Sequence, residues 1–424
     1  MDSYAHATTI AQIAGKFQYA PLEIEGTKLN SDQRAYRLTS IDMLRGLVIV
    51  IMAIDHTRDF FSTSMSIDPM NDPNVGLPLA LTRWITHFCA PVFVFLAGTS
   101  AGLMAVRKTS AELGRFLLTR GLWLIFVEVF IISTAGTFAP GGIEELGGHT
   151  LAFMQVIWVI GASMVLLAGM QYAGRKVCLA LGAIIVLGHN ALDGHWPVSQ
   201  GILDTSPPLW AALHVSMSKV AGPFHFLFLY PLIPWLGVML LGFGASALFE
   251  REAVARKRAL LAWGIGITAA FIVLRFIDGY GEPNHWQTQA RGVATFVDFL
   301  NTTKYPPSLL FLAMTLGPAA IFCAHAERMR GFIKDTFVMF GRVPFAFYVA
   351  HFYLLHLLSL LLGAAQGIPI GELLTFPPFY PPNYGVSLPL VYAVWALVIV
   401  LLYPLCRWMA GVKARSRAWW LSYL

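Results

Sequence analysis

A histidine flanked by two carboxylates stands at the end of the first long apolar stretch of the sequence. In segment 53–59, Asp55 and Asp59 are four residues apart and share a helix face, where Arg58 can pair with Asp55. Asp59 follows His56 by three residues and can orient its ring, an arrangement that raises the basicity of an imidazole. This pattern predicts a general base that works near neutral pH. The alternative is an ion-pair cluster that anchors the helix end at a membrane interface.

Other histidines lie at a comparable depth in separate apolar stretches. Counted at about 1.5 Å of rise per residue, His56, His87 and His351 fall at a similar level on three expected helices. They could therefore converge on one cavity, although each alone could equally be a hydrogen-bonded core histidine. Tyr348 shares a helix face with His351, whereas His356 lies on another face.

Cations cluster at the opposite ends of these stretches. Arg45 follows Asp42 by three residues inside the first apolar run, and Arg115 and Arg120 lie near the start of another. Together these three arginines could bind phosphate groups. The alternative for Arg45 is an ion pair with Asp42 that reaches the interface along its aliphatic stem.

The composition requires a non-aqueous environment for most of the protein surface. Of the 424 residues, 57% are hydrophobic and only 12% are charged, about half the charged fraction of a soluble domain. The four cysteines are far apart within apolar runs, so neither a disulfide framework nor a cysteine-based zinc spacing is present. The net charge of +6 fits positive loops on one face of a membrane protein better than nucleic-acid binding. The sequence therefore predicts an all-α, polytopic membrane bundle.

Ten apolar runs of about 20 residues are candidates for crossing a bilayer. The fifth is short, and in the ninth Gly341 and Pro344 predict a kink or break. The runs are 39–60, 80–106, 114–136, 150–172, 177–192, 222–249, 258–278, 305–326, 335–361 and 387–409.

The distribution of charge predicts the orientation of these spans. Ten spans place both termini on one side, and most of the 29 Lys and Arg residues fall on that side, which leaves Lys219, Arg291 and Lys304 in the outer loops. By the positive-inside rule, both termini are cytoplasmic. No cleaved signal peptide is expected. The expected domains are a cytoplasmic tail (1–38), the transmembrane domain (39–412) and a second cytoplasmic tail (413–424).

The outer loops are long and the inner loops are short. Long ordered loops usually carry function, so chemistry or substrate access is expected on the outer face, in segments 193–221, 279–304 and 362–386. These loops contain tryptophans that could stack on a sugar ring, or that could simply belong to the aromatic belt of a membrane protein. They are Trp196, Trp210 and Trp286.

Five short motifs are spread along the chain from about residue 36 to its end. They are 37–46, followed by Asp55 and His56; 83–98, with Arg83, His87 and Pro91; 230–237; 304–311; and 341–344, followed by Tyr348 and His351. Together they resemble the heparan-α-glucosaminide N-acetyltransferase family in its bacterial branch. The resemblance implies an enzyme of the bacterial inner membrane that takes an acyl group, expected to be acetyl, from cytosolic acyl-CoA. It would pass that group to an extracytoplasmic acceptor, typically a sugar or glycan.

The resemblance also points to a catalytic histidine. Membrane O-acyltransferases of bacterial polysaccharides share the Arg-Gly pair, with a histidine eleven residues after the arginine, and Arg45 and His56 have that spacing. His56 is therefore the expected base. The human-type enzyme has asparagine at this position and its reactive histidine farther along, where His87 is the nearest in this chain. An acyl-histidine intermediate and a direct transfer both stay open.

The resemblance implies supporting roles for the remaining site residues. A carboxylate would hold the tautomer of His56, a cation or hydroxyl would stabilise the oxyanion, and arginines would bind the CoA phosphates. In that order the candidates are Asp55 or Asp59; Arg342 or Tyr348; and Arg45, Arg115 and Arg120. No metal and no nucleic acid are expected; the expected partners are the bilayer, acyl-CoA and the acceptor, and a homodimer is left open.

Two other classes of function compete with the enzyme. A proton-coupled transporter of a small polar or glycan-related substrate would also place His and Asp within broken helices. The absence of visible repeat halves in the sequence and the one-sided histidines count against it. A non-catalytic membrane scaffold is the third reading, and the intramembrane charges count against that.

Overall fold

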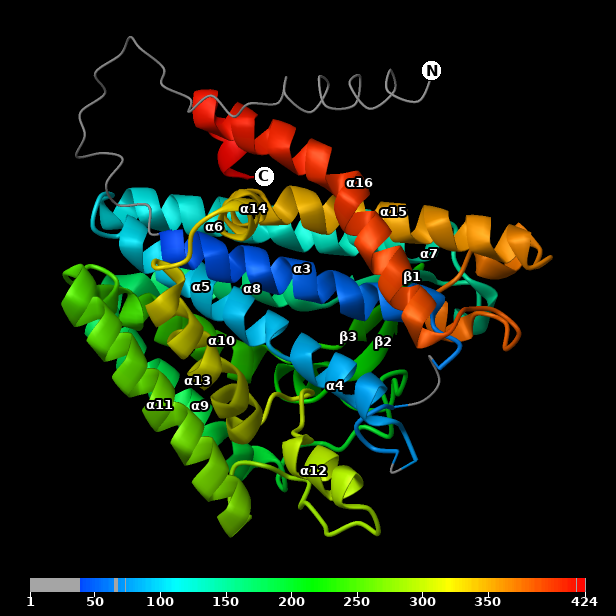
Figure 1. Cartoon of the computed structure of the whole chain (residues 1–424), viewed down its shortest axis with the longest axis horizontal. Helices are drawn as coiled ribbons and strands as arrows, with labels where there is room; N and C mark the ends of the chain where they lie inside the picture. Colours follow the sequence, from blue (N-terminus) through cyan, green and yellow to red (C-terminus); the bar gives the residue numbers. More distant parts are fainter. Residues whose placement is uncertain (1–38, 65–67, 73, 417, 424) are drawn as a thin grey trace, which may run out of the picture. The chain divides into compact units, whose positions relative to one another are not determined.

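The computed structural model describes residues 39–64, 68–72, 74–416 and 418–423. The expected tail 1–38 lies outside the described residues. From Thr39 onward the chain forms one unit, built mainly of long helices (Figure 1). Their bounds are α3 Thr39–Phe61, α4 Leu77–Thr86, α5 Cys89–Met104, α6 Ser110–Phe126, α7 Ser133–Thr137, α8 Val156–Met170, α9 Arg175–Gly188, α10 Leu232–Ala245, α11 Ala253–Ile277, α12 Gly292–Leu300, α13 Leu309–Ala326, α14 Phe332–Arg342, α15 Pro344–Ala365 and α16 Leu388–Arg415.

The multi-pass helical membrane fold predicted from the sequence is confirmed. Within the described ranges, eight helical stretches are long and apolar enough to cross a membrane. They coincide with eight of the ten predicted spans. The other two correspond to α3, which carries charged side chains near both ends, and to α10, which belongs to a shorter apolar helix, Leu232–Leu248. The count of ten and the cytoplasmic location of both termini stay predictions.

Prolines break two of the predicted spans. Pro91 has no N–H to bond the carbonyl of His87, and the second span accordingly divides there into α4 and α5. The ninth span divides at Val343, directly before Pro344, into α14 and α15. The break predicted from Gly341 and Pro344 is thus confirmed.

Helix α3 is the central element of the bundle. It contacts α4, α5, α13, α14, α15 and α16, and it runs through the middle of the view in Figure 1. Its crossing with α14 is too close for side chains: a Cβ on Gly46 would lie 1.8 Å from the carbonyl oxygen of Phe337, and a Cβ on Gly341 would lie 1.8 Å from that of Asp42. The glycine of the Arg-Gly pair is therefore required by helix packing.

A small sheet replaces the first turns of two predicted helical spans. Strands β1 (Thr150–Met154), β2 (Met217–Ala221) and β3 (Phe224–Phe228) form a sheet in which β1 pairs parallel to β3 and β2 pairs antiparallel to it. The prediction of helix over all of 150–172 and 222–249 was therefore wrong at the start of each span, where the structure has a strand. The residues of β1 and β3 are mostly apolar, like those of the helices α8 and α10 that follow them, so hydropathy alone cannot separate strand from helix.

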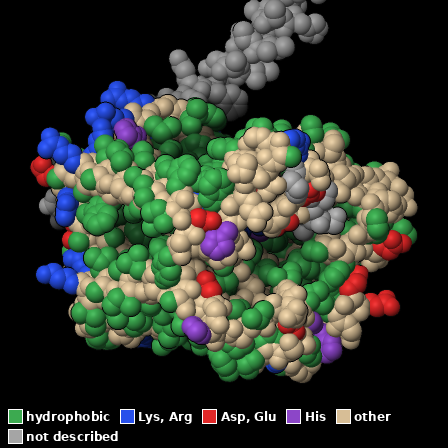
Figure 2. All heavy atoms as spheres, turned by 90° about the horizontal axis from the view of Figure 1, so that it is seen from below, with side chains coloured by type: hydrophobic (Ala, Val, Ile, Leu, Met, Phe, Trp, Pro, Cys, Tyr) green, Lys and Arg blue, Asp and Glu red, His purple; other side chains and the backbone are tan. Residues whose placement is uncertain are grey.

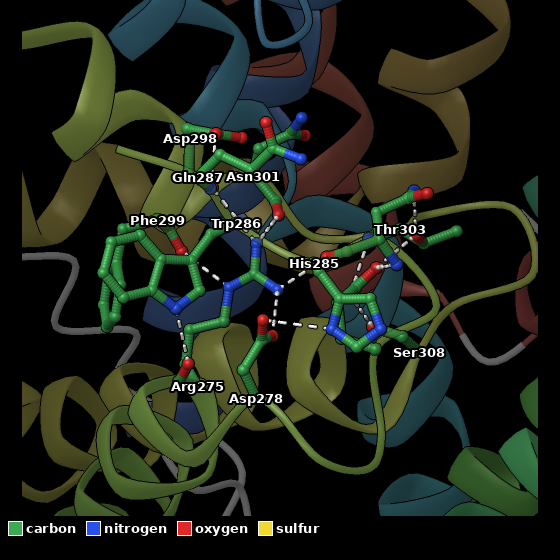
Figure 3. A network of polar contacts seen from close by, with 12 residues as sticks. Arg275, Asp278, His285, Trp286, Gln287, Asp298, Phe299, Asn301, Thr303 and Ser308 are labelled. Carbon is green, nitrogen blue, oxygen red and sulfur yellow. Dashed lines mark hydrogen bonds and ion pairs between the residues drawn. The ribbon is translucent and has the colours of Figure 1, made fainter. Parts of the chain in front are cut away.

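The outer loop between α11 and α13 is held by a buried arginine. Arg275 is only 1% exposed and donates hydrogen bonds to the backbone carbonyls of Asn284, Asp298, Phe299 and Asn301 (Figure 3). This loop contains α12, a helix that the sequence did not predict.

Glu282 fixes the end of the same loop. Its carboxylate accepts hydrogen bonds from the backbone N–H of Thr303 (2.9 Å) and from the hydroxyl of Ser308 (2.6 Å). Arg275 and Glu282 together determine where the intervening residues Lys304 and Tyr305 lie.

Charged side chains are unevenly distributed over the surface. Figure 2 shows a largely hydrophobic face with Lys and Arg gathered at one edge, and with Asp, Glu and His nearer the centre and the opposite edge. A wide apolar face is what lipid contact requires, because a soluble protein rarely exposes one. The one-sided cations agree with the positive-inside pattern read from the sequence.

Candidate active site

A cavity of about 280 Å³ opens beside the second half of α3. Its floor carries the predicted site residues Asp55, His56 and Asp59. The other walls come from α4 and α5, the ends of β1 and β3, and three loop segments. Those segments contribute Tyr230, Lys304 with Tyr305, and Phe376 to Pro378. We call this the outer cavity.

His56 is accessible from the outer cavity. Its side chain is 16% exposed, and its Nδ1 lies 3.8 Å from an Asp59 carboxylate oxygen. The ring packs against Phe352, with centroids 4.5 Å apart, and against His351 at 5.2 Å. Asp59 can therefore orient the ring after a small movement, as the i, i+3 spacing predicted.

The Asp55 carboxylate forms ion pairs with three cationic side chains. Arg83 Nη1 donates to both of its carboxylate oxygens, at 2.9 and 2.8 Å. Arg58 Nη2 is 3.2 Å away, as the i, i+3 spacing predicted, and Lys304 Nζ is 3.9 Å away. Asp55 thus holds three cations beside His56, and Asp59 is the carboxylate in contact with the ring.

The three predicted histidines do not all converge. His351 is fully buried next to His56; its Nδ1 lies 2.5 Å from the carbonyl oxygen of Tyr348, and its Nε2 has no hydrogen-bond partner within the described part of the chain. His87 instead packs on Phe311 of α13 and lines neither large cavity near the site, which corrects the expected convergence. The α4–α5 break directs it there.

His356 is a buried core histidine that faces two backbone carbonyls. Its Nδ1 bonds to the carbonyl oxygen of Ala135 (2.9 Å) and its Nε2 to that of Leu373 (3.0 Å). The ring stacks on Phe138 at 4.0 Å. Both nitrogens are thus engaged in holding segments together.

A second cavity, of about 320 Å³, opens at the first half of α3. Its cations are Arg45, Arg120, Arg342 and Lys413. Arg45 donates to the hydroxyl of Ser100 (3.0 Å) and to the carbonyl of Gly341 (3.3 Å), and it also forms the ion pair with Asp42 (3.3 Å) that was its alternative. We call this the inner cavity.

Two expected roles change with this geometry. Arg342 lies in the inner cavity with Arg45, not beside His56, because α14 ends at the level of the Arg-Gly pair; it is not placed to stabilise an oxyanion near His56. Arg115 is exposed and lies outside the inner cavity, whereas Arg120, on another face of α6, lines it. Lys413, which the sequence reading did not select, takes the place expected for Arg115.

The two cavities meet. Met52, Phe93 and Val156 line both of them and form the partition between them. Tyr348 lines the inner cavity, and its hydroxyl and the carboxyl of Glu128 are both buried without a hydrogen-bond partner among the described residues. Glu128 belongs to the π-helical turn Val127–Ile132, a local irregularity that is frequent at functional sites.

Sequence reasoning missed Lys304, Tyr305 and Tyr230 as site residues. All three line the outer cavity, and the rings of Tyr230 and Tyr305 lie 5.4 Å apart. Burial, and then Tyr305 beside it, raise the pKa of Tyr230 well above its usual range, so its hydroxyl stays protonated at neutral pH. The sequence did contain a signal for these residues, because they lie in segments 230–237 and 304–311, which are two of the five motifs. None of the tryptophans proposed for sugar stacking lines this cavity.

A family model for the catalytic region of heparan-alpha-glucosaminide N-acetyltransferase matches residues 37–277, more than half of the chain. The chain belongs to this family. The resemblance seen in the sequence motifs is thereby confirmed. No curated protein matches the chain.

Family membership makes the chain a membrane protein of an acetyltransferase family that uses acetyl-CoA as its donor in general. The matched residues run from the start of α3 to the end of α11, so they include both Arg45 and His56. Arg342, Tyr348 and His351 lie beyond the match, and only the geometry connects them with the two cavities.

Proposed function

We propose that this protein transfers an acetyl group from cytosolic acetyl-CoA, bound in the inner cavity, to an acceptor in the outer cavity, with His56 as general base. The observation that carries the proposal is the pair of cavities that share Met52, Phe93 and Val156. One cavity offers cations to a polyphosphate, and the other offers a base to an acceptor. The reaction would take place at their junction.

The inner cavity fits the phosphate-bearing part of the donor. Arg45, Arg120, Arg342 and Lys413 present positive charge around one opening, and guanidinium groups bind phosphates with directed hydrogen bonds. Arg45 and His56 are separated along α3 by about 16 Å. An extended pantetheine arm has about that length, so a CoA held by the cations would bring its thioester to the level of His56.

The outer cavity fits the acceptor and the developing charge. The acceptor nitrogen or oxygen attacks the thioester carbonyl while His56 takes the acceptor proton and Asp59 steadies the imidazolium. Lys304 and Arg83 replace Arg342 as the cations that stabilise the oxyanion. Collapse of the tetrahedral adduct breaks the carbon–sulfur bond, and the CoA thiolate leaves and takes up the proton from His56. No acyl-histidine is needed on this route.

The lining of the outer cavity favours a sugar as the acceptor. Aromatic rings of Phe60, Tyr305 and Phe352 surround His56 and the charged groups, and sugars commonly bind between aromatic faces and hydrogen-bonding side chains. The family name describes transfer to the amine of a glucosaminide, and an amino sugar is therefore the first acceptor to test. The positive-inside pattern supports an orientation in a bacterial inner membrane in which the outer cavity is extracytoplasmic.

The release of free thiol from acetyl-CoA tests the proposal. Purified protein in detergent would be incubated with acetyl-CoA, with or without D-glucosamine as acceptor probe. We expect thiol release that depends on enzyme and increases with the amino sugar, together with N-acetylated product. A proton-coupled transporter would release no thiol. If no thiol is released with any of a panel of amino sugars and sugar alcohols while acetyl-CoA binds, the proposal fails.

A further inference from the structure

A cluster of two histidines and one aspartate lies apart from both cavities, at the outer end of α9. His189 begins the 3-10 turn that follows α9, Asp193 ends it, and His214 follows the 3-10 turn Leu209–Leu213. One ligand-type atom from each side chain lies within 4.8 Å of the other two. None of the three lines the inner or the outer cavity.

Hydrogen bonds account for only part of the cluster. His214 Nε2 and an Asp193 carboxylate oxygen are 2.9 Å apart, and Asn190 donates to the other oxygen, also at 2.9 Å. Asp193 is the one carboxylate of the cluster, and both of its oxygens have a hydrogen-bond partner. The cluster therefore contains one fixed negative charge.

His189 is the side chain that this network leaves unexplained. It is 2% exposed, and both of its ring nitrogens lack a hydrogen-bond partner among the residues that the structure describes. His214 is fully buried, and its Nδ1 also lacks a partner there. Buried polar atoms without partners are rare, because each has lost its hydrogen bonds to water without replacement. A structural hydrogen-bonded cluster would account for His214 Nε2 and Asp193, but it leaves His214 Nδ1 and both nitrogens of His189 without a partner.

We propose that His189, Asp193 and His214 bind one divalent transition-metal ion, with zinc the best fit. Zinc takes neutral imidazole nitrogens and a carboxylate oxygen at about 2.0–2.2 Å, with water or a fourth group completing a tetrahedron. In such a site the ligand atoms are about 3.3 Å apart, so the side chains need to close by about 1 Å or more from their widest separation here. Asn190 would stay as the hydrogen-bond partner that orients the carboxylate.

The ion would stabilise one wall of the outer cavity. It joins the end of α9 to the segment 193–216, whose Ile202 lines the outer cavity. The carbonyl of Ile202 in turn accepts a hydrogen bond from Ser218 in β2. The sequence shows no cysteine-based zinc spacing, and no metal was expected from it; the proposed site uses two histidines and an aspartate instead. It does not depend on the proposed acyl transfer.

Metal content tests the proposal directly. Tag-free protein would be treated with EDTA, reloaded with ZnCl2, desalted and analysed by inductively coupled plasma mass spectrometry. We expect about one zinc per wild-type chain, and less than about a tenth in His189→Ala and in Asp193→Asn. Asp193→Asn keeps the side-chain shape, so it remains informative if His189→Ala fails to fold.

His285 provides a matched control. Its Nδ1 lies 3.0 Å from an Asp278 oxygen in an exposed pair, drawn in Figure 3. Neither residue belongs to the three-residue cluster, so His285→Ala should keep the zinc. Retention of zinc by Asp193→Asn, or a folded wild type that holds no zinc after loading, would overturn the proposal.

Two spectroscopic readouts locate the ion. The Trp196 indole packs edge-on to the His214 ring at 5.3 Å, so Co²⁺ at the site should quench its fluorescence and show visible absorption of a four-coordinate ion. Both signals should be lost in Asp193→Asn.

Discussion

Arg45 and His56 are eleven residues apart on one helix, yet their side chains line different cavities. Their spacing along α3 could be read from the sequence, because it depends only on helix rise. The residues that lie beside them in the fold could not be predicted from the sequence. Lys304 lies beside Asp55 because its loop is held by Arg275 at the end of α11 and by Glu282 within the loop itself. Arg342 departs from its expected place because a glycine crossing fixes the end of α14.

Loss of the base should abolish turnover but not donor binding. We expect His56→Ala to lower kcat by about 10²-fold or more, because general-base catalysis contributes that much. Steady-state thiol release and acetyl-CoA binding would be measured separately. His87→Gln is the control: His87 lies outside both cavities, so its variant should keep kcat within a few-fold. Near wild-type turnover in a folded His56→Ala protein would remove His56 from its role.

Neutralising a cation of the inner cavity should weaken donor binding. We expect Arg120→Gln to raise the Kd for CoA about tenfold, equivalent to about 1.4 kcal/mol, through loss of one charge-assisted contact. Arg115→Gln removes the same charge from an exposed site on the same helix, and it should leave the Kd unchanged. Isothermal titration of both variants with CoA measures the difference. Equal effects of the two substitutions would contradict a cavity-specific phosphate contact.

Lys304 should matter for the chemical step. We expect Lys304→Met to lower kcat about 10²-fold with little change in CoA affinity, because one oxyanion-stabilising group is lost. Lys219→Met is matched by residue type, but Lys219 lies in β2 and bonds loop carbonyls away from the cavity. Single-turnover kinetics compares the two variants. A drop in both, or in neither, would argue against Lys304 as the oxyanion cation.

At the scale of elements, the long helices and their proline breaks followed from local sequence. Apolar length predicted the spans, and Pro344 predicted the break before α15. The strands β1 and β3 did not follow, because pairing between segments about 75 residues apart determines them. The closeness of α3 and α14 was equally hidden, since Gly46 and Gly341 are distant in the sequence and meet only in the fold.

The α3–α14 crossing should tolerate no side chain. We expect Gly46→Ala to destabilise the protein by about 1–3 kcal/mol, because the added methyl must displace the backbone of Phe337. Gly266→Ala in α11 is the control: nothing lies within 4 Å of its Cβ position, and alanine is favoured in a helix by about 1 kcal/mol. Thermal unfolding in detergent should show a lowered Tm only for Gly46→Ala. An unchanged Tm there would mean that the two helices pack less closely.

At the scale of the whole molecule, two cavities lie at the two halves of α3 and share one partition, and we propose that they open toward opposite sides of the membrane. The sequence predicted the separation of the two kinds of residue: cations at one level and histidines at the other. It could not predict the partition, because Met52, Phe93 and Val156 come from three helices that are brought together only in the fold. Family membership supports the chemistry, and the positive-inside pattern supports the orientation.

The sidedness of CoA binding tests this account most directly. Radiolabelled CoA would be titrated onto sealed inside-out and right-side-out membrane vesicles that contain equal amounts of the protein, with Arg120→Gln vesicles as the control for specific binding. We predict saturable binding to the inside-out vesicles only, weakened by Arg120→Gln, because CoA cannot cross the bilayer and the cation-lined cavity is proposed to face the cytoplasm. Equal saturable binding to sealed right-side-out vesicles would contradict a donor that enters from the inner face.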